Sequence, residues 1–330
     1  QFELSEPYAP FMSSLVRFYI VDSETLKANE NDGDWGQEYL LSNSAGTGAY
    51  SITAHDPNVE TRMAKNSNYF LGISEMAPDE AILRYNLDAP TVRTLMSNDE
   101  HDISSNWLPT DVKAAIGNSG DKLAKVVSAG GWYFKINTTR APLDDVNCRK
   151  SLAYALDYDS LVGTFQVTDD IAAGQKARGP IPQGMIGYSE DVPLVEYDLD
   201  KARDYLSKCK YSGDDLKVTI NWIAEVPFEE SWALILQQGA MAIGYDATVE
   251  TLPWAVFSEQ VTKPETTPNL SIVAVQAQTP DPDGLIYNMY HSAAAGTWQS
   301  AEWVQDDKID AMLNAGRTTI DGNERVAIYE

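Results

Sequence analysis

Hydrophobic and polar residues alternate most clearly in two stretches of the chain. From Leu216 to Trp222 every second side chain is apolar, which is the period of a β-strand with one buried face. Residues 133–137 alternate in the same way, with Phe134 and Ile136 as the apolar members. The pattern therefore predicts two strands, and in each case the following residues change to helical spacing.

The segment after residue 137 shows this change of period. A turn at Pro142 and an N-cap at Asp144 or Asp145 predict the start of a helix. One face of this helix forms a buried apolar stripe made of Cys148, Leu152, Ala155 and Leu156. Asp157 and Asp159 interrupt the stripe and predict a second short helix that continues to Phe165.

A succession of five elements begins at the strand 216–222. The next helix has its apolar face within 232–243 and ends at Gly244. A strand at Ala247–Leu252, a short helix from Trp254 and a continuously apolar strand at Leu270–Ala277 follow. This β-α-β-α-β order predicts a right-handed, mostly parallel sheet, and ligands of such sheets bind beyond the carboxyl ends of the strands.

Length and charge limit the class of protein. The 330 residues exceed one ordinary hydrophobic core, so we expect two or more lobes. The net charge of −25 argues against nucleic acid and anionic membranes as partners. Because the carboxylates are spread along the chain, we expect a surface that repels its neighbours rather than an acidic site for a cationic ligand. The chain has no apolar run of the roughly 20 residues that span a membrane.

The chain lacks the residue patterns of common enzymes. His55, His101 and His291 are scattered, without metal-ligand spacing or an acid partner at a fixed offset. The motifs G-x-S-x-G, H-E-x-x-H and C-x-x-C are missing from the sequence. Gly46-Thr47-Gly48 lacks the Gly-Lys-Ser/Thr of a phosphate-binding loop, so we expect a tight turn there. We therefore expect no enzyme activity, no cofactor and no metal site.

Cys148 and Cys209 both lie on apolar helix faces. Two buried thiols are favoured over a disulfide, because a bridge requires Cα atoms within about 7 Å. An oxidising compartment would favour the bridge.

The two ends of the chain have the residue patterns of secondary-structure interiors. Phe2 and Leu4 alternate like residues inside a strand, and the helical pattern of 324–330 has no C-cap, so we expect a fragment of a longer polypeptide.

Several motifs follow one another in the order typical of one protein family. NSAGTGAYSI at 43–52 is similar to a "G-T-G-P-Y" turn, and AKNSNYFLG at 64–72 to "R-N-x-x-Y-W-x-G". Residues 82–103 are expected to form a strand, a helix and a second strand, ending where the family has "G-x-x-D". The helix after Pro142 matches "D-x-x-x-R-x-A-x-x-x-A-x-D", with Ser151 in place of the first Ala. YDLDKARDYLSK at 197–208 and the helix pair expected at 312–329 continue the order. The chain thus resembles bacterial extracellular solute-binding proteins of family 5.

This resemblance implies a fold and a function. The fold is α/β and periplasmic-binding-protein-like (type II, cluster C): lobes with mixed, largely parallel sheets flanked by helices, and a ligand cleft between the lobes. Residues 1–41 would be the remainder of an inserted lobe and a crossover, 42–127 part of the first lobe, and 128–330 the large C-terminal lobe. The implied function is the substrate-binding component of an ABC importer, which captures a peptide or similar small solute. Alternatives are an oligosaccharide binder of the same family, or a secreted hydrolase or signalling receptor on the same scaffold.

The implied partners are a small-molecule ligand, peptide or oligosaccharide, and the ABC permease subunits, with no nucleic acid and a monomeric protein. The implied location is extracytoplasmic, either in the periplasm or as a cell-surface lipoprotein.

Trp254 is the first candidate for ligand contact, because it stands directly after a strand and the family commonly carries a pocket Trp there. Gln278 occupies the position where peptide-binding members have an aspartate for the ligand's α-amino group. A neutral amide cannot pair with an ammonium as a carboxylate does, which favours a sugar or another hydroxyl-rich ligand. Asp281 or Asp283 would be substitutes, although a turn and a helix N-cap are the favoured roles for them. The further candidates are Trp222, Asn137, Trp107, Arg178 and Trp132. Trp132 and Tyr133 are neighbours on one strand, so we expect one of them to face the core and the other the cleft.

Overall fold

The computed structural model describes residues 2–104 and 108–330 of the chain. The chain divides into two compact units. The large unit consists of Gln1–Ser14 and Asn106–Glu330, and the small unit is Leu15–Ser105. The three-part division inferred from the family resemblance stays a prediction. No helix in the described parts of the chain is both long and apolar enough to cross a membrane.

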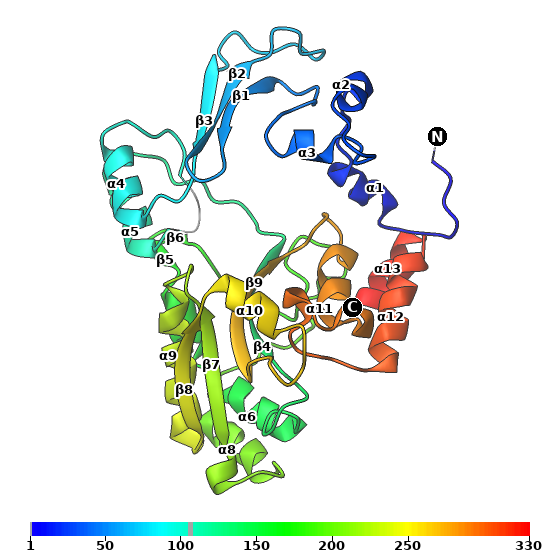
Figure 1. The fold of residues 1–330 in the computed structure, drawn as a ribbon. Helices are drawn as coiled ribbons and strands as arrows, with labels where there is room; N and C mark the ends of the chain where they lie inside the picture. The colour runs from blue at the N-terminus through cyan, green and yellow to red at the C-terminus, as the bar shows by residue number, and fades with distance from the viewer. Residues whose placement is uncertain (1, 105–107) are drawn as a thin grey trace. The chain divides into compact units, whose positions relative to one another are not determined.

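A mixed four-stranded sheet forms the centre of the large unit (Figure 1). Its strands, in spatial order, are β4 (Gly130–Ile136), β9 (Leu270–Gln276), β7 (Lys217–Ile223) and β8 (Asp246–Leu252). β7 runs parallel to both β8 and β9, whereas β4 pairs with β9 in antiparallel register. The helices α9 (Glu229–Ile243) and α10 (Trp254–Gln260) connect the parallel strands. The predicted β-α-β-α-β succession is therefore confirmed.

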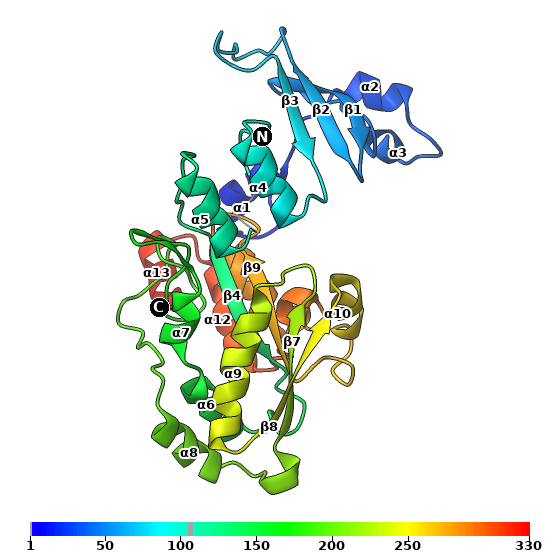
Figure 2. The ribbon, with the colours of Figure 1, turned by 90° about the vertical axis from the view of Figure 1, so that its left-hand side faces the viewer.

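Each face of this sheet carries a hydrophobic core. On one face α9 packs with α6 (Val146–Ala155) and α8 (Leu199–Ser207), and the three helices lie along the same side of the sheet in Figure 2. On the other face Phe257 and Val261 pack against Leu285 and Met289. β9 is buried on both faces, which explains why its sequence is apolar without alternation.

The predicted helix ends are found in the large unit. The side chain of Asp145, rather than Asp144, caps α6 through the amide of Asn147. The predicted second short helix is α7 (Tyr158–Gly163), which is capped by the side chain of Asp157 and ends before Phe165. Gly244 ends α9 in the left-handed conformation with φ 114°, which favours glycine because it has no Cβ.

The remaining elements of the large unit are short helices and a hairpin. They are α1 (Phe11–Ser14), α5 (Thr110–Asn118), β5 (Gln166–Thr168), β6 (Ile171–Ala172), a π-helical turn (Asp283–Tyr287), α11 (Asn288–Tyr290), α12 (Asp307–Thr318) and α13 (Gly322–Tyr329). Short 3-10 turns lie at Gly213–Asp215, Ser292–Ala294 and Trp298–Ser300. The last two helices confirm the helix pair expected near the end of the chain.

Cys148 and Cys209 form a disulfide with a Cα–Cα distance of 5.3 Å. The expectation of two free thiols is therefore wrong. The cause is the packing of α6 against α8, which brings Cys209, two residues beyond the end of α8, next to Cys148. The stripe on each helix was visible in the sequence, but the pairing of the helices was not.

The small unit is built on an antiparallel sheet of β1 (Tyr50–Asp56), β2 (Glu60–Lys65) and β3 (Glu80–Arg84) in that order. Its helices are α2 (Ser23–Ala28), α3 (Gln37–Leu40) and α4 (Ala89–Ser97), and the 3-10 turn Leu15–Arg17 precedes them. The second strand expected before Ile103 is not formed among residues 98–104. Asp99 instead takes a φ of 57° and the amide of Glu100 donates to Leu95 O, so these residues close the end of α4.

Candidate functional site

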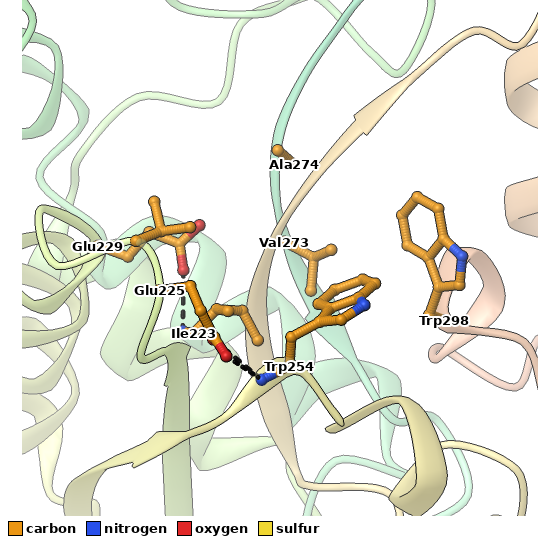
Figure 3. A pocket seen from close by; sticks show the side chains of 8 residues that line it. Ile223, Glu225, Glu229, Trp254, Val273, Ala274 and Trp298 are labelled. Atoms are coloured by element: carbon orange, nitrogen blue, oxygen red, sulfur yellow. Dashed lines mark hydrogen bonds between the residues drawn. The ribbon is translucent and has the colours of Figure 1, made fainter. Parts of the chain in front are cut away.

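A pocket of about 440 Å³ opens at the carboxyl ends of the parallel strands in the large unit. Ile223 ends β7, Trp254 begins α10 directly after β8, and Val273 and Ala274 belong to the second half of β9. The other lining residues are Glu225, Val226, Glu229 and Trp298 (Figure 3). This is the edge of the sheet that the β-α-β-α-β order predicts for a ligand.

Two indole rings form one side of the pocket. The centroids of Trp254 and Trp298 are 5.3 Å apart and the ring planes meet at 70°, an edge-to-face arrangement. Trp254 also contacts Phe257 of its own helix, yet 36% of its surface stays exposed. The indole of Trp254 therefore offers apolar area to the pocket while the second core holds its other side.

Glu225 fixes the start of the helix that carries Trp254. Both carboxylate oxygens of Glu225 accept from the main-chain amide of Trp254, at 3.0 and 3.2 Å. This amide is the first of α10 and has no partner inside the helix, so the carboxylate satisfies it. Glu225 itself lies in the loop after β7 and is exposed.

Glu229 is the most buried polar residue of the pocket, with 1% of its surface exposed. It is the first residue of α9, and its Oε2 accepts from the amide of Ile223 at 3.0 Å. Its Oε1 accepts from Nε1 of Trp132 at 3.1 Å. Burial raises the pKa of this carboxyl to about 8, although the two donors act in the opposite direction. The carboxyl of Glu229 therefore keeps its proton to a higher pH than an exposed glutamate does.

Trp132 of β4 positions Glu229 through the hydrogen bond from its indole. Its ring packs at 5.5 to 6.0 Å from Phe165, Phe228 and Trp232, as part of the first core. Tyr133, its neighbour in β4, packs against the second core and donates its hydroxyl to Pro180 O. Each of these two side chains thus contacts a core of the large unit, and neither lines the pocket.

The other sequence candidates lie outside the pocket lining. Trp222 packs against the first core, on the face of β7 opposite to Ile223. Asn137 is 0% exposed, and its Nδ2 donates to the carbonyls of Pro264 and Thr267 at 3.0 and 3.2 Å. It joins the end of β4 to the turn before β9. A role of these residues in ligand binding stays a prediction.

Three further candidates occupy loops. Arg178 donates to the carbonyls of Glu190 and Val192 and so braces its own loop. Gln278 is exposed just after β9, where its main-chain N–H donates to Gly284 O at 3.0 Å. Trp107 lies outside the described residues.

Asp281 is buried in a bidentate ion pair with Arg325 of α13, at 2.6 and 2.7 Å. Asp281 Oδ1 also accepts from the amide of Asp283, which is the turn role that the sequence favoured. Asp283 in turn receives two hydrogen bonds from Arg317. The two C-terminal helices therefore hold the loop that follows Gln278.

Asp145, Cys148 and Cys209 place potential metal-binding atoms within 4.8 Å of one another. The two sulfurs are joined in a disulfide and cannot act as thiolate ligands. A single carboxylate remains, so this cluster is not a metal centre.

Comparison with known proteins gives consistent results. Residues 1–297 match the family model described as "Bacterial extracellular solute-binding proteins, family 5 Middle". The chain is 24% identical over 339 residues to the probable D,D-dipeptide-binding periplasmic protein DdpA of Escherichia coli, covering 100% of this chain and 62% of that protein. It is also 24% identical over 340 residues to the dipeptide-binding protein of the same organism, covering 100% and 61%. The chain thus spans about three fifths of these relatives' length.

Solved structures share the fold, as the sequence predicted. The ABC transporter substrate-binding protein CtaP of Listeria monocytogenes superposes with a TM-score of 0.84 at 18% identity, over 99% of this chain and 64% of that one. The periplasmic binding protein DppA of Helicobacter pylori, in complex with the peptide STSA, gives a TM-score of 0.77 at 21% identity, over 99% and 62%.

Proposed function

Because this chain belongs to family 5 of the bacterial extracellular solute-binding proteins, we propose that it is part of the substrate-binding component of an ABC importer. The proposed ligand is a peptide or a similar small solute, as the names of the two Escherichia coli relatives suggest. One observation carries the proposal. A pocket with a partly exposed indole opens at the carboxyl ends of the parallel strands, which is where sheets of this type bind ligands.

The pocket suits a side chain of the captured solute. Its volume of about 440 Å³ is within the range of small-molecule sites, and apolar groups form most of its lining. Trp254 and Trp298 supply rigid contact area at a low cost in conformational entropy. Gln278, just beyond β9, carries an amide with donors and an acceptor that suits the main chain of a peptide.

The same proposal covers location, partners and chemistry. We expect the protein to act outside the cytoplasm, in the periplasm or as a cell-surface lipoprotein, and to deliver its ligand unchanged to a membrane permease. Binding without turnover is expected, because the described residues that line the pocket include no nucleophile beside a base.

A thermal-shift screen of the purified protein tests the proposal. A ligand present at 100 times its Kd stabilises the folded state by about 2.7 kcal/mol. We expect members of a dipeptide and tripeptide library to raise the Tm. An oligosaccharide library run in parallel is expected to leave it unchanged. Shifts with oligosaccharides alone would contradict the peptide proposal.

A matched pair of tryptophan variants tests the pocket. Trp254→Ala is expected to weaken binding of a peptide from the screen at least tenfold, because the indole contact is lost. Trp35→Ala removes an indole that is 76% exposed in the small unit and is expected to leave the affinity unchanged. Equal affinities in both variants would place the ligand elsewhere.

A further inference from the structure

The pocket has an uneven distribution of charge. Two of its lining residues, Glu225 and Glu229, carry carboxyl groups, and no lysine, arginine or histidine lines it among the described residues. In Figure 3 the two glutamates lie on one side of the pocket and the indoles of Trp254 and Trp298 on the other. A ligand group that enters between them meets acidic and aromatic surfaces together.

This combination suits a positive charge on the ligand. Indole is the best aromatic partner of a cation, and the attraction grows when water is excluded from the contact. A carboxylate adds a charge-assisted hydrogen bond, which is about twice as strong as a neutral one. A ligand carboxylate would instead meet like charge without a basic partner.

Each glutamate keeps capacity for a further hydrogen bond. The oxygens of Glu225 share one main-chain amide, and among the described residues each oxygen of Glu229 accepts one hydrogen bond, from Ile223 or from Trp132. A carboxylate accepts about four hydrogen bonds in all. The protein's own donors thus hold both groups in place without saturating them.

Granted the proposed function, we propose that this pocket selects ligands with an organic cation, so that the captured peptides carry a guanidinium or ammonium side chain. The guanidinium is the better fit, because its planar face stacks on indole while its edge donates to carboxylates. The spread of acidic residues along the sequence argued against a cationic ligand. The fold nevertheless brings two of them to one pocket.

The ionisation of Glu229 makes the affinity for a cationic ligand depend on pH. The influences on its pKa are burial, the amide of Ile223 and the indole of Trp132, with no charged side chain of the described residues among them. Among the described residues that line the pocket, Glu225 is the other titratable side chain. A cation in the pocket favours the ionised form of Glu229, so binding releases a proton and tightens as the pH rises toward 8.

The first experiment compares ligands that differ only in charge. Isothermal titration of the protein with Ala-Arg and with Ala-citrulline contrasts a guanidinium with a neutral urea of the same shape. We expect Ala-Arg to bind at least tenfold more tightly. Butylguanidinium and butylurea form a second pair without a peptide backbone, and the same order of affinity is expected.

The second experiment uses variants. Glu225→Gln and Glu229→Gln are each expected to reduce the Ala-Arg preference at least fivefold. Glu230→Gln is the matched control, because Glu230 follows Glu229 on α9 but is exposed and outside the pocket lining. Butylguanidinium stays charged at all working pH values. Its affinity is expected to rise about tenfold from pH 6 to pH 8 in the protein and to stay flat in Glu229→Gln.

The outcomes separate the two proposals. Equal binding of Ala-Arg and Ala-citrulline supports peptide capture and overturns cation selection. Binding of butylguanidinium over butylurea, with no peptide bound at all, supports the cation pocket and overturns peptide capture. The comparison of ligands needs no variant, so it decides the matter even if Glu229→Gln fails to fold.

Discussion

The two sheets of this protein differ in how they are buried. In the large unit β9 is buried along nearly its whole length, with cores on both faces of the sheet. In the small unit most positions of β1 and β3 are exposed. The apolar side chains buried among the described residues of the small unit are Ala45, Val92 and Met96. The comparison indicates that folding free energy is concentrated in the large unit, and four predictions test it.

Ion pairs should show the largest difference between the units. Arg325→Met leaves the buried carboxylate of Asp281 without its cation and is expected to cost about 3–5 kcal/mol of unfolding free energy. Arg62→Met breaks the contacts with Glu60 and Glu80 on the exposed sheet of the small unit, and no measurable change is expected. Urea titration followed by tryptophan fluorescence measures both, and equal losses would contradict the comparison.

The disulfide should act on the large unit alone. Replacing Cys148 and Cys209 with serine opens a loop of 61 residues, which is expected to cost about 4 kcal/mol in the chain-entropy account. Amide hydrogen exchange resolves the effect by region. We expect faster exchange in β7 and β9 and unchanged exchange in β1 and β2, and uniform acceleration would show that the units unfold together.

Leucine truncation compares the sheets directly. Leu270→Ala in β9 removes a side chain that is 1% exposed and is expected to cost about 3 kcal/mol, from lost burial and the cavity left behind. Leu83→Ala in β3 starts from 53% exposure and is expected to cost less than about 1 kcal/mol. Thermal unfolding of the two variants measures the difference. Similar Tm values would mean that β3 is buried in solution.

The pH dependence of the unfolding free energy gives the smallest expected effect, counted per pH unit. Because the folded pKa of Glu229 is raised from 4.5 to about 8, the folded state keeps a proton that the unfolded state loses between these values. The contribution of Glu229 to stability is therefore full below pH 4.5 and falls by about 1.4 kcal/mol for each pH unit up to 8. Urea midpoints from pH 5 to pH 8 should show this slope in Glu230→Gln and lose it in Glu229→Gln. A slope that survives Glu229→Gln would assign the proton to another group.

The local sequence pattern was sufficient to predict the elements of the large sheet and the position of Trp254 at the carboxyl end of a strand. The alternation in β7, the helical spacing in α9 and the apolar run of β9 each follow from side chains within a few residues, and their order locates the pocket edge. Glu229 was overlooked although a signal exists. It lies three and seven residues before Trp232 and Leu236, on the buried stripe of α9, where a carboxylate is out of place unless it has a role.

Other features arise only when distant segments meet. Trp298 is in a short 3-10 turn without periodicity, and only the packing of that turn brings it to Trp254. The disulfide depends on the pairing of α6 with α8. Asn137, expected at the edge of a cleft, is enclosed by the carbonyls of residues 264 and 267. In each case the partner lies far along the chain, where local pattern holds no information.

The antiparallel pairing of β4 with β9 has a consequence for the kinetics of folding. Gly130 is in register with Gln276, and Ile136 with Leu270, so the two strands are separated by the whole β7-α9-β8-α10 succession. During synthesis β4 leaves the ribosome long before its partner exists. Such non-local pairing must close a large loop before it gains contacts, which slows folding. The sheet therefore closes only after β9 is made, and until then β4 is an unpaired strand that a chaperone can bind.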